Sequence, residues 1–192
     1  SRTASRPIVL LEHADRMNDS THILDELLKN PGPRVMVPYL WDTAAAEKAI
    51  AAGEGAEITL PVGGWSSDRA GPPVTLTGRI VYAGDKSYRG TGKMWNGYEI
   101  RLGPTAVIDT GDVVVSIVAR YDFAMDLEPF TQFGYDNNDF DIVLLRSKTH
   151  FRAVYEDIAA EIIVVDTPDW GPADLATLPY RNARTGLFPL DR

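Results

Sequence analysis

The hydrophobic pattern of this chain changes twice along its length. Residues 7–11, 141–145 and 161–165 are short, largely apolar runs, whereas residues 56–121 alternate apolar and polar side chains with a period of two. A continuous apolar run is typical of a parallel strand buried on both faces, and a two-residue period indicates an antiparallel strand with one solvated face. The chain is therefore expected to combine a parallel and an antiparallel β-region.

Helical patterns accompany the apolar runs near both ends of the sequence. Residues 23–28 and 151–158 carry apolar side chains at helical spacing. An alanine-rich helix is expected to begin with Thr43 as its cap and to end at Gly53, because glycine readily adopts the backbone conformation that closes a helix. Strands and helices thus alternate outside the middle region.

A further strand is expected at residues 34–40. Pro38 lies within it and has no N–H to donate to a ladder, so we expect this strand near a sheet edge or ending at Pro38. The whole pattern predicts an α/β fold. It consists of a small, mostly parallel sheet with flanking helices, interrupted by an antiparallel β insert that forms a barrel-like or curled sheet.

The 192 residues suit one domain with an insert. We expect residues 1–55 and 141–192 to form the α/β part, residues 56–121 the antiparallel insert, and residues 122–140 a connecting loop. Turn-forming residues divide the insert into short strands, and one of these turns is expected at residues 84–85.

Composition excludes several classes of function. The chain has no cysteine, which rules out disulfides, thiolate metal sites and a cysteine nucleophile, and favours a cytoplasmic location. Its 27 acidic and 19 basic residues give a formal net charge of -8, which repels phosphate backbones, so no nucleic-acid partner is expected. No apolar run approaches the roughly 20 residues that cross a bilayer, so no membrane partner is expected either.

A ligand site is expected at one edge of the predicted parallel sheet. Ligands of open parallel sheets bind beyond the carboxyl ends of the strands, where loops lead to helix N-termini. Four segments should converge there, namely residues 12–19, 39–43, 146–150 and 166–169.

The segment LLEHADRMNDSTH enters this predicted edge and admits two interpretations. His13, Asp15, Asp19 and His22 are suitable ligands for Zn²⁺ or Mn²⁺, and three of them with water would make a catalytic metal site. Alternatively, Asp19 or Ser20 caps the following helix and the two histidines are partly exposed. The cap is the favoured interpretation, because the spacing matches no helical pair of metal ligands.

The segment RSKTHFR enters the same edge. Ser147 or Thr149 could cap the helix that follows, with the charges solvated. Alternatively, the hydroxyl of Ser147, the imidazole of His150 and the guanidinium groups of Arg146 and Arg152 could hold a substrate carboxylate. The residues alone leave both interpretations open.

Several short segments occur in a recognisable order over nearly the whole chain. Each is weak alone, but together they resemble the C-terminal domain of the microcystinase C-like (MlrC-like) zinc metallopeptidase family. The segments are residues 8–11, 15, 19–21, 52–57, 71–73, 102–107, 147–153, 164–168, 178–181 and 188–191.

The resemblance implies a bacterial, cytoplasmic hydrolase of peptide-type amide bonds with a catalytic zinc. It also implies that the zinc ligands belong to an N-terminal domain that precedes this region, in agreement with the absence of an initiator methionine, and that no zinc is held by this chain. The partners expected are that N-terminal zinc-binding catalytic domain and a peptide or amide substrate, and a homo-oligomer is compatible with the sequence.

The leading hypothesis is an accessory domain that forms one wall of the substrate cleft and supplies no catalytic residue and no metal ligand. One alternative is a free-standing binding or assembly module without catalysis. Another is a self-sufficient metal hydrolase that uses His13, Asp15, Asp19 and His22. For the leading hypothesis, the expected substrate-binding residues are Asp15, Asn18, Asp19, Arg146, Ser147, His150 and Arg152.

Overall fold

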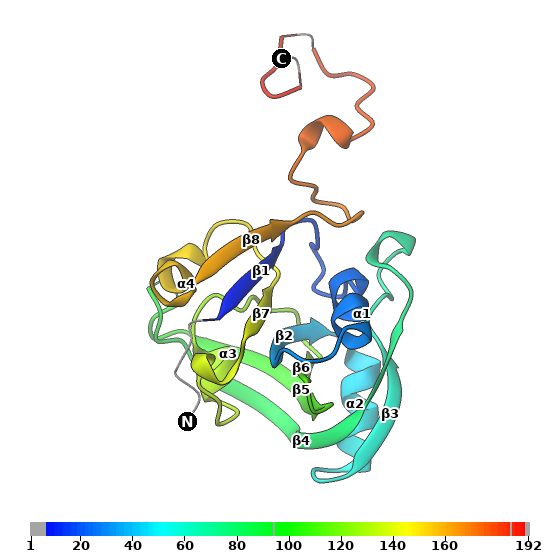
Figure 1. Ribbon diagram of the computed structural model, residues 1–192, viewed down its shortest axis with the longest axis vertical. Coiled ribbons are helices and arrows are strands. Elements are labelled where there is room, and N and C mark those ends of the chain that lie inside the picture. Colours follow the sequence, from blue (N-terminus) through cyan, green and yellow to red (C-terminus); the bar gives the residue numbers. More distant parts are fainter. Residues whose placement is uncertain (1–6, 94, 185, 191–192) are drawn as a thin grey trace.

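The structure is a computed structural model that describes residues 7–93, 95–184 and 186–190. The described residues form one eight-stranded sheet in the order β3-β4-β5-β6-β2-β7-β1-β8 (Figure 1). Position 191, which closes the last segment of the resemblance, and the two ends of the predicted domain 1–192 lie outside the described residues. The strands are β1 (Ile8–Glu12), β2 (Val35–Trp41), β3 (Glu57–Val62), β4 (Val74–Arg89), β5 (Glu99–Asp109), β6 (Val113–Val118), β7 (Ile142–Leu145) and β8 (Glu161–Val165).

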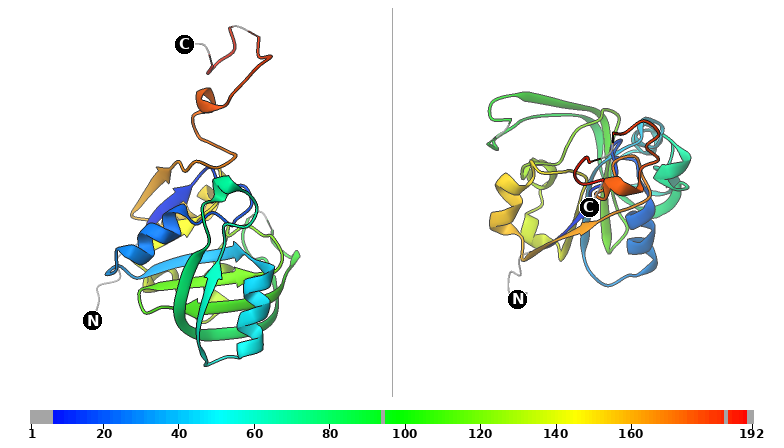
Figure 2. Two further views of the ribbon diagram at one scale, coloured as in Figure 1. Left: turned by 90° about the vertical axis from the view of Figure 1, so that its right-hand side faces the viewer. Right: turned by 90° about the horizontal axis from the view of Figure 1, so that it is seen from above.

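Parallel and antiparallel strands share this sheet. The strands β6, β2, β7, β1 and β8 are parallel to one another, whereas β3, β4, β5 and β6 pair antiparallel. β6 joins the two regions because it pairs antiparallel with β5 and parallel with β2. This arrangement confirms the predicted α/β fold with a mostly parallel sheet. The antiparallel strands curl around one side of the molecule without closing a barrel (Figures 1 and 2).

Helices cover both faces of the sheet (Figure 1). On one face, Val37 of β2 and Ala46 belong to one hydrophobic cluster; on the other, Met36 and Phe130 belong to a second cluster. Neighbouring residues of β2 therefore enter different cores, which explains its continuous apolar run. The helices are α1 (His22–Lys29), α2 (Thr43–Ala52), α3 (Glu128–Thr131) and α4 (Arg152–Ile158), with 3-10 turns η1 (Asp68–Ala70), η2 (Asn137–Asp139) and η3 (Leu175–Thr177).

The predicted end of α2 at Gly53 is confirmed, with φ at 88°. Its cap is Asp42 rather than Thr43, since the Asp42 side chain accepts a hydrogen bond from the N–H of Ala45. After β8 the chain leaves the sheet as an extended tail with one short helical turn, η3 (Figures 1 and 2). Among the helices that the structure describes, none has the length and apolar character needed to cross a bilayer.

Two strands occupy places in the sheet that differ from the prediction. β2 lies inside the sheet, between β6 and β7, although it contains Pro38. The register shifts between Val37 and Leu40, Tyr39 takes a positive φ of 57°, and its N–H donates to the hydroxyl of Ser116 instead of a strand carbonyl. The irregularity accommodates a residue without an N–H, because the ladder is interrupted there anyway.

The apolar run of β8 predicts a buried strand, but β8 lies at the edge of the sheet. Ile163 and Val164 are 40% and 49% exposed. The turn expected at residues 84–85 is also absent, because β4 runs without interruption from Val74 to Arg89 and pairs with β5 through Gly84 and Asp85. Pairing with a long partner strand outweighs the local turn preference of glycine and aspartate.

Candidate functional site

The loops that follow the parallel strands meet at one edge of the sheet. The N–H of Trp41, at the end of β2, donates to the carbonyl of Asn18, and the N–H of Gly171 donates to the carbonyl of Ala14. Arg146, which follows β7, reaches the loop after β1. The predicted convergence of these segments is therefore confirmed, and it follows from the parallel orientation of the strands.

Arg146 lies at the centre of this edge, and its side chain is only 2% exposed. Its Nε is 2.7 Å from Oδ2 of Asp15 and 3.5 Å from Oε2 of Glu12. One of its terminal nitrogens, Nη2, donates to the carbonyl of Ser20 at 3.0 Å. One buried guanidinium thus holds two buried carboxylates and the backbone of the loop after β1.

Glu12 is fully buried at the end of β1 and joins three segments of the chain. Its Oε1 accepts hydrogen bonds from the hydroxyls of Ser20 and Thr167. Burial raises the pKa of Glu12; Arg146 opposes this rise, and the nearby charge of Asp15 adds to it.

We expect Glu12→Gln to weaken the pH dependence of folding. The unfolded chain releases the Glu12 proton near pH 4.5, whereas the folded protein retains it to higher pH. Between those two values the folded state binds more protons, so the free energy of unfolding falls as the pH rises. Urea unfolding measured from pH 4 upward should show a smaller fall in Glu12→Gln than in the unaltered protein. Glu47→Gln, on the exposed face of α2, should keep the original slope, and equal slopes in all three proteins would contradict this account.

Asp15 organises the loop after β1. Its Oδ1 accepts from the N–H groups of Met17 and Asn18 at 2.9 and 2.7 Å, and its Oδ2 accepts from the N–H of Ser20 at 3.1 Å. Asn18 has a positive φ of 56°, which asparagine tolerates better than most residues. Asp15 and Asn18 are both buried, so they shape the site from beneath its surface.

Asp19 binds a loop of the antiparallel region. Its Oδ2 accepts from the N–H groups of Trp65 and Ser66 at 3.0 and 2.8 Å, and its Oδ1 accepts from the Ser66 hydroxyl at 2.7 Å. The residue before α1 is Thr21, and it makes no side-chain capping bond. The predicted cap by Asp19 or Ser20 is therefore wrong, because backbone donors from a distant loop engage Asp19 instead.

The same contacts bear on the metal interpretation. His13 Nδ1 lies 3.1 Å from the carbonyl of Gly171, and His22 Nε2 lies 2.8 Å from the carbonyl of Arg69. Asp15 and Asp19 are held by the separate sets of backbone donors given above. Within residues 7–93, 95–184 and 186–190, no group of three or more His, Asp and Glu side chains is arranged to hold a metal ion. These four side chains are therefore not arranged as the ligands of one metal ion. This argues against the hypothesis of a self-sufficient metal hydrolase that uses them.

The second predicted cluster divides between the interior and the surface. Ser147 is buried beside Arg146, whereas His150 is exposed. α4 starts after Phe151 without a side-chain cap, so the predicted cap by Ser147 or Thr149 is wrong. Arg152 is 47% exposed and pairs with Glu156 of its own helix at 2.7 Å. Contact between Arg152 and a ligand at the strand ends would require this exposed pair to open.

A cavity of about 350 Å³ adjoins the buried cluster. The sequence indicated the segment that contains Ser147, Thr149 and His150, but it missed Trp95, Phe123 and Met125. Trp95 comes from the β4–β5 connection, and Phe123 and Met125 come from the segment after β6, so no local pattern links these three residues to the strand-end loops. The lining residues are Arg16, Trp95, Phe123, Met125, Ser147, Lys148, Thr149 and His150.

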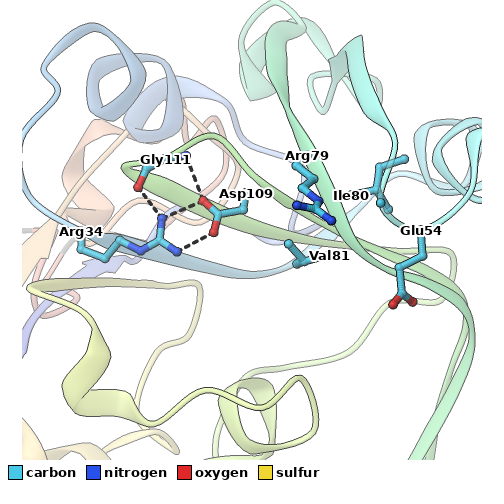
Figure 3. A pocket seen from close by; sticks show the side chains of 8 residues that line it. Arg34, Glu54, Arg79, Ile80, Val81, Asp109 and Gly111 are labelled. Carbon is cyan, nitrogen blue, oxygen red and sulfur yellow. Dashed lines mark hydrogen bonds and ion pairs between the residues drawn. The ribbon is translucent and has the colours of Figure 1, made fainter.

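A wider hollow of about 800 Å³ lies near the start of β2 and the end of β5 (Figure 3). Arg34 and Arg79 both line it, but Arg34 donates to both carboxylate oxygens of Asp109, at 2.7 and 2.6 Å. The guanidinium lowers the pKa of Asp109. Because this arginine is already neutralised and ties β2 to β5, the pair is best explained as structural.

The fold agrees with that of a known protein. The chain belongs to the family described as MlrC C-terminus, whose profile matches residues 17–182. It is 23% identical over 166 residues to microcystinase C of Sphingomonas sp., a match that covers 83% of this chain and 32% of the relative. The crystal structure of a protein from Mesorhizobium sp. BNC1 named "Putative metallopeptidase" matches with a TM-score of 0.83 and 26% identity, over 100% of this chain and 39% of the other. The chain thus spans about a third of the length of these relatives.

Proposed function

We propose that this chain forms the substrate-contacting C-terminal domain of a larger zinc-dependent hydrolase of peptide-type amide bonds. In this proposal the zinc ligands belong to another domain of the same protein. The family match, the similarity to microcystinase C and the structural neighbour named as a metallopeptidase support the class of enzyme. The misfit of His13, Asp15, Asp19 and His22 to a metal centre supports a role other than metal binding for the loop after β1.

The observation that carries the proposal is the buried network around Arg146, with an open cavity beside it. Arg146, Asp15 and Glu12 tie the loops to one another, and a binding surface needs such supporting contacts to present its groups in a fixed geometry. We infer that the buried residues Asp15, Asn18, Asp19 and Arg146 position this surface. Ser147 and His150, which line the cavity, would contact the substrate.

We expect His150→Gln to lower kcat/KM for peptide hydrolysis by about tenfold or more, because one hydrogen bond to a charged group contributes about 1.5–3 kcal/mol. The variant is made in a protein that carries this chain together with its metal-binding domain. Its zinc content should be unchanged, because His150 is not proposed as a ligand. Lys48→Gln, on the exposed face of α2, is the control and should keep full activity.

Two results would contradict the proposal. One is unaltered kinetics in a folded His150→Gln protein, which would remove this residue from the cleft. The other is stoichiometric metal together with peptide hydrolysis in this chain alone, which would place the catalytic centre here. Arg152→Ala is measured in parallel, and a raised KM would show that the Arg152–Glu156 pair opens to admit substrate.

A further inference from the structure

The cavity beside Arg146 combines apolar and cationic walls. Trp95, Phe123 and Met125 supply aromatic and aliphatic surface, and Arg16, Lys148 and His150 supply groups that carry or can acquire positive charge. A volume of about 350 Å³ lies at the lower end of the range for small-molecule sites, so it suits one large residue or a molecule of similar size.

Among the residues that the structure describes, the cationic groups at this cavity form no close ion pair. Within the described part of the chain, the ion pairs do not include Arg16, Lys148 or His150. Lys148 Nζ instead donates to the carbonyl of Gly171 at 3.2 Å and lies 3.5 Å from His13 Nδ1. In a chain with a formal net charge of -8, cationic groups at a cavity that form no close ion pair with a described residue favour an anionic ligand.

Two further features favour an anionic ligand in this cavity. Burial, followed by the positive charge of Arg16, lowers the pKa of Lys148, and Asp166 only partly offsets this. An anion in the cavity would relieve that repulsion. The indole N–H of Trp95, another lining residue, is buried and has no hydrogen-bond partner. A buried donor without a partner is costly, and the carbonyl or carboxylate oxygen of a ligand could satisfy it.

We propose that this cavity binds a carboxylate attached to an apolar or aromatic group, such as the C-terminal residue of a peptide. Lys148 and Arg16 contact the carboxylate, while Trp95, Phe123 and Met125 contact the side chain. The inference rests on the proposed function in one respect only, that the ligand is a substrate or product of amide hydrolysis. Binding itself is a property of this chain and is tested without catalysis.

The test compares three small probes with this chain by NMR titration and calorimetry. N-acetylphenylalanine has both the ring and the carboxylate, N-acetylphenylalaninamide lacks the charge, and N-acetylglycine lacks the ring. We expect N-acetylphenylalanine to bind at least about tenfold more tightly than either of the others, as expected for the loss of one charged or one large apolar contact. The indole N–H signal of Trp95, assigned by its loss in Trp95→Phe, should shift on binding.

Lys148→Gln should weaken binding of N-acetylphenylalanine by about tenfold, whereas Lys48→Gln should bind it normally. Arg16→Gln should have an effect in the same direction. Absence of binding by N-acetylphenylalanine, equal binding of the acid and its amide, or normal binding by Lys148→Gln would each overturn the proposal. Equal binding of N-acetylglycine would overturn the apolar part of it.

The outcomes separate this inference from the proposed function. If N-acetylphenylalanine binds as described but His150→Gln hydrolyses peptides normally, the cavity is a carboxylate site and the cleft proposal fails. If His150→Gln loses activity but the chain does not bind N-acetylphenylalanine, the cleft proposal stands and the ligand class assigned here is wrong.

Discussion

Replacing Arg146 with methionine is expected to destabilise the protein by about 3–5 kcal/mol. Methionine fills much of the same space, but it leaves the buried carboxylates of Asp15 and Glu12 without their cation and the carbonyl of Ser20 without a donor. Removal of one partner from a buried ion pair has effects of this size, because the remaining charge stays out of water. For a domain of this length each kcal/mol corresponds to about 2–4 °C in Tm, so calorimetry should show a fall of roughly 10 °C.

Arg152→Met is the matched control for this experiment. Arg152 pairs with Glu156 at the same 2.7 Å, but the two side chains are 47% and 55% exposed. Exposed pairs contribute about 0–1 kcal/mol, so Tm should change little. In the double variant Asp15→Asn with Arg146→Met, part of the loss should be recovered, because one of the unpaired charges is removed. An Arg146→Met protein as stable as the Arg152→Met control would show that the buried network does not hold the strand ends together.

The second large effect is expected for Gly64→Ala, in the loop that binds Asp19. Gly64 has a φ of 65°, and a Cβ added there would lie 2.8 Å from the N of Pro73 and closer still to the carbonyl of Gly71. Its N–H also donates to the carbonyl of Asp19 at 2.7 Å. The left-handed conformation costs about 1–2 kcal/mol for alanine, and a clash with backbone adds about 1–3 kcal/mol. We therefore expect a total loss of about 3 kcal/mol in urea unfolding.

Gly134→Ala separates the cost of the left-handed backbone conformation from the cost of the clash. Gly134 has a φ of 82°, but no atom would lie within 4 Å of an added Cβ. Alanine there should cost only the conformational part, about 1–2 kcal/mol. If both variants lose the same stability, the close approach between the Gly64 loop and the segment at Gly71 contributes nothing. That result would also weaken the argument that Asp19 serves to hold this loop.

Much of the fold follows from local patterns in the sequence. Continuous apolar runs predicted β1 and β7 as strands buried on both faces, helical spacing predicted α1 and α4, and Gly53 marked the end of α2. Because parallel strands place their carboxyl ends at one edge, the sequence also predicted that the loops containing Asp15 and Arg146 would meet. These inferences succeed because burial, helical periodicity and chain direction are local properties.

Other features depend on pairing between distant segments. Pro38 suggested an edge strand, but an irregularity at Tyr39 allows β2 to lie inside the sheet. The apolar run of β8 suggested burial, yet the order of strands leaves β8 at the edge. The residue pattern of a strand indicates which environments suit that strand. Which strands lie beside it is decided by the total energy of pairing and packing over the whole sheet.

The candidate site, like the fold, is predicted only in part by the sequence. The sequence by itself determined which loops approach one another and that they carry carboxylates, a guanidinium and a histidine. Only the tertiary structure decided what each group contacts: Asp19 binds Trp65 and Ser66 instead of capping a helix, and Arg152 turns to Glu156. It also brought Trp95 to the cavity from the β4–β5 connection. The physical reason is that a polar side chain bonds to whichever donors the completed fold places within about 3 Å, and those donors come from anywhere in the chain.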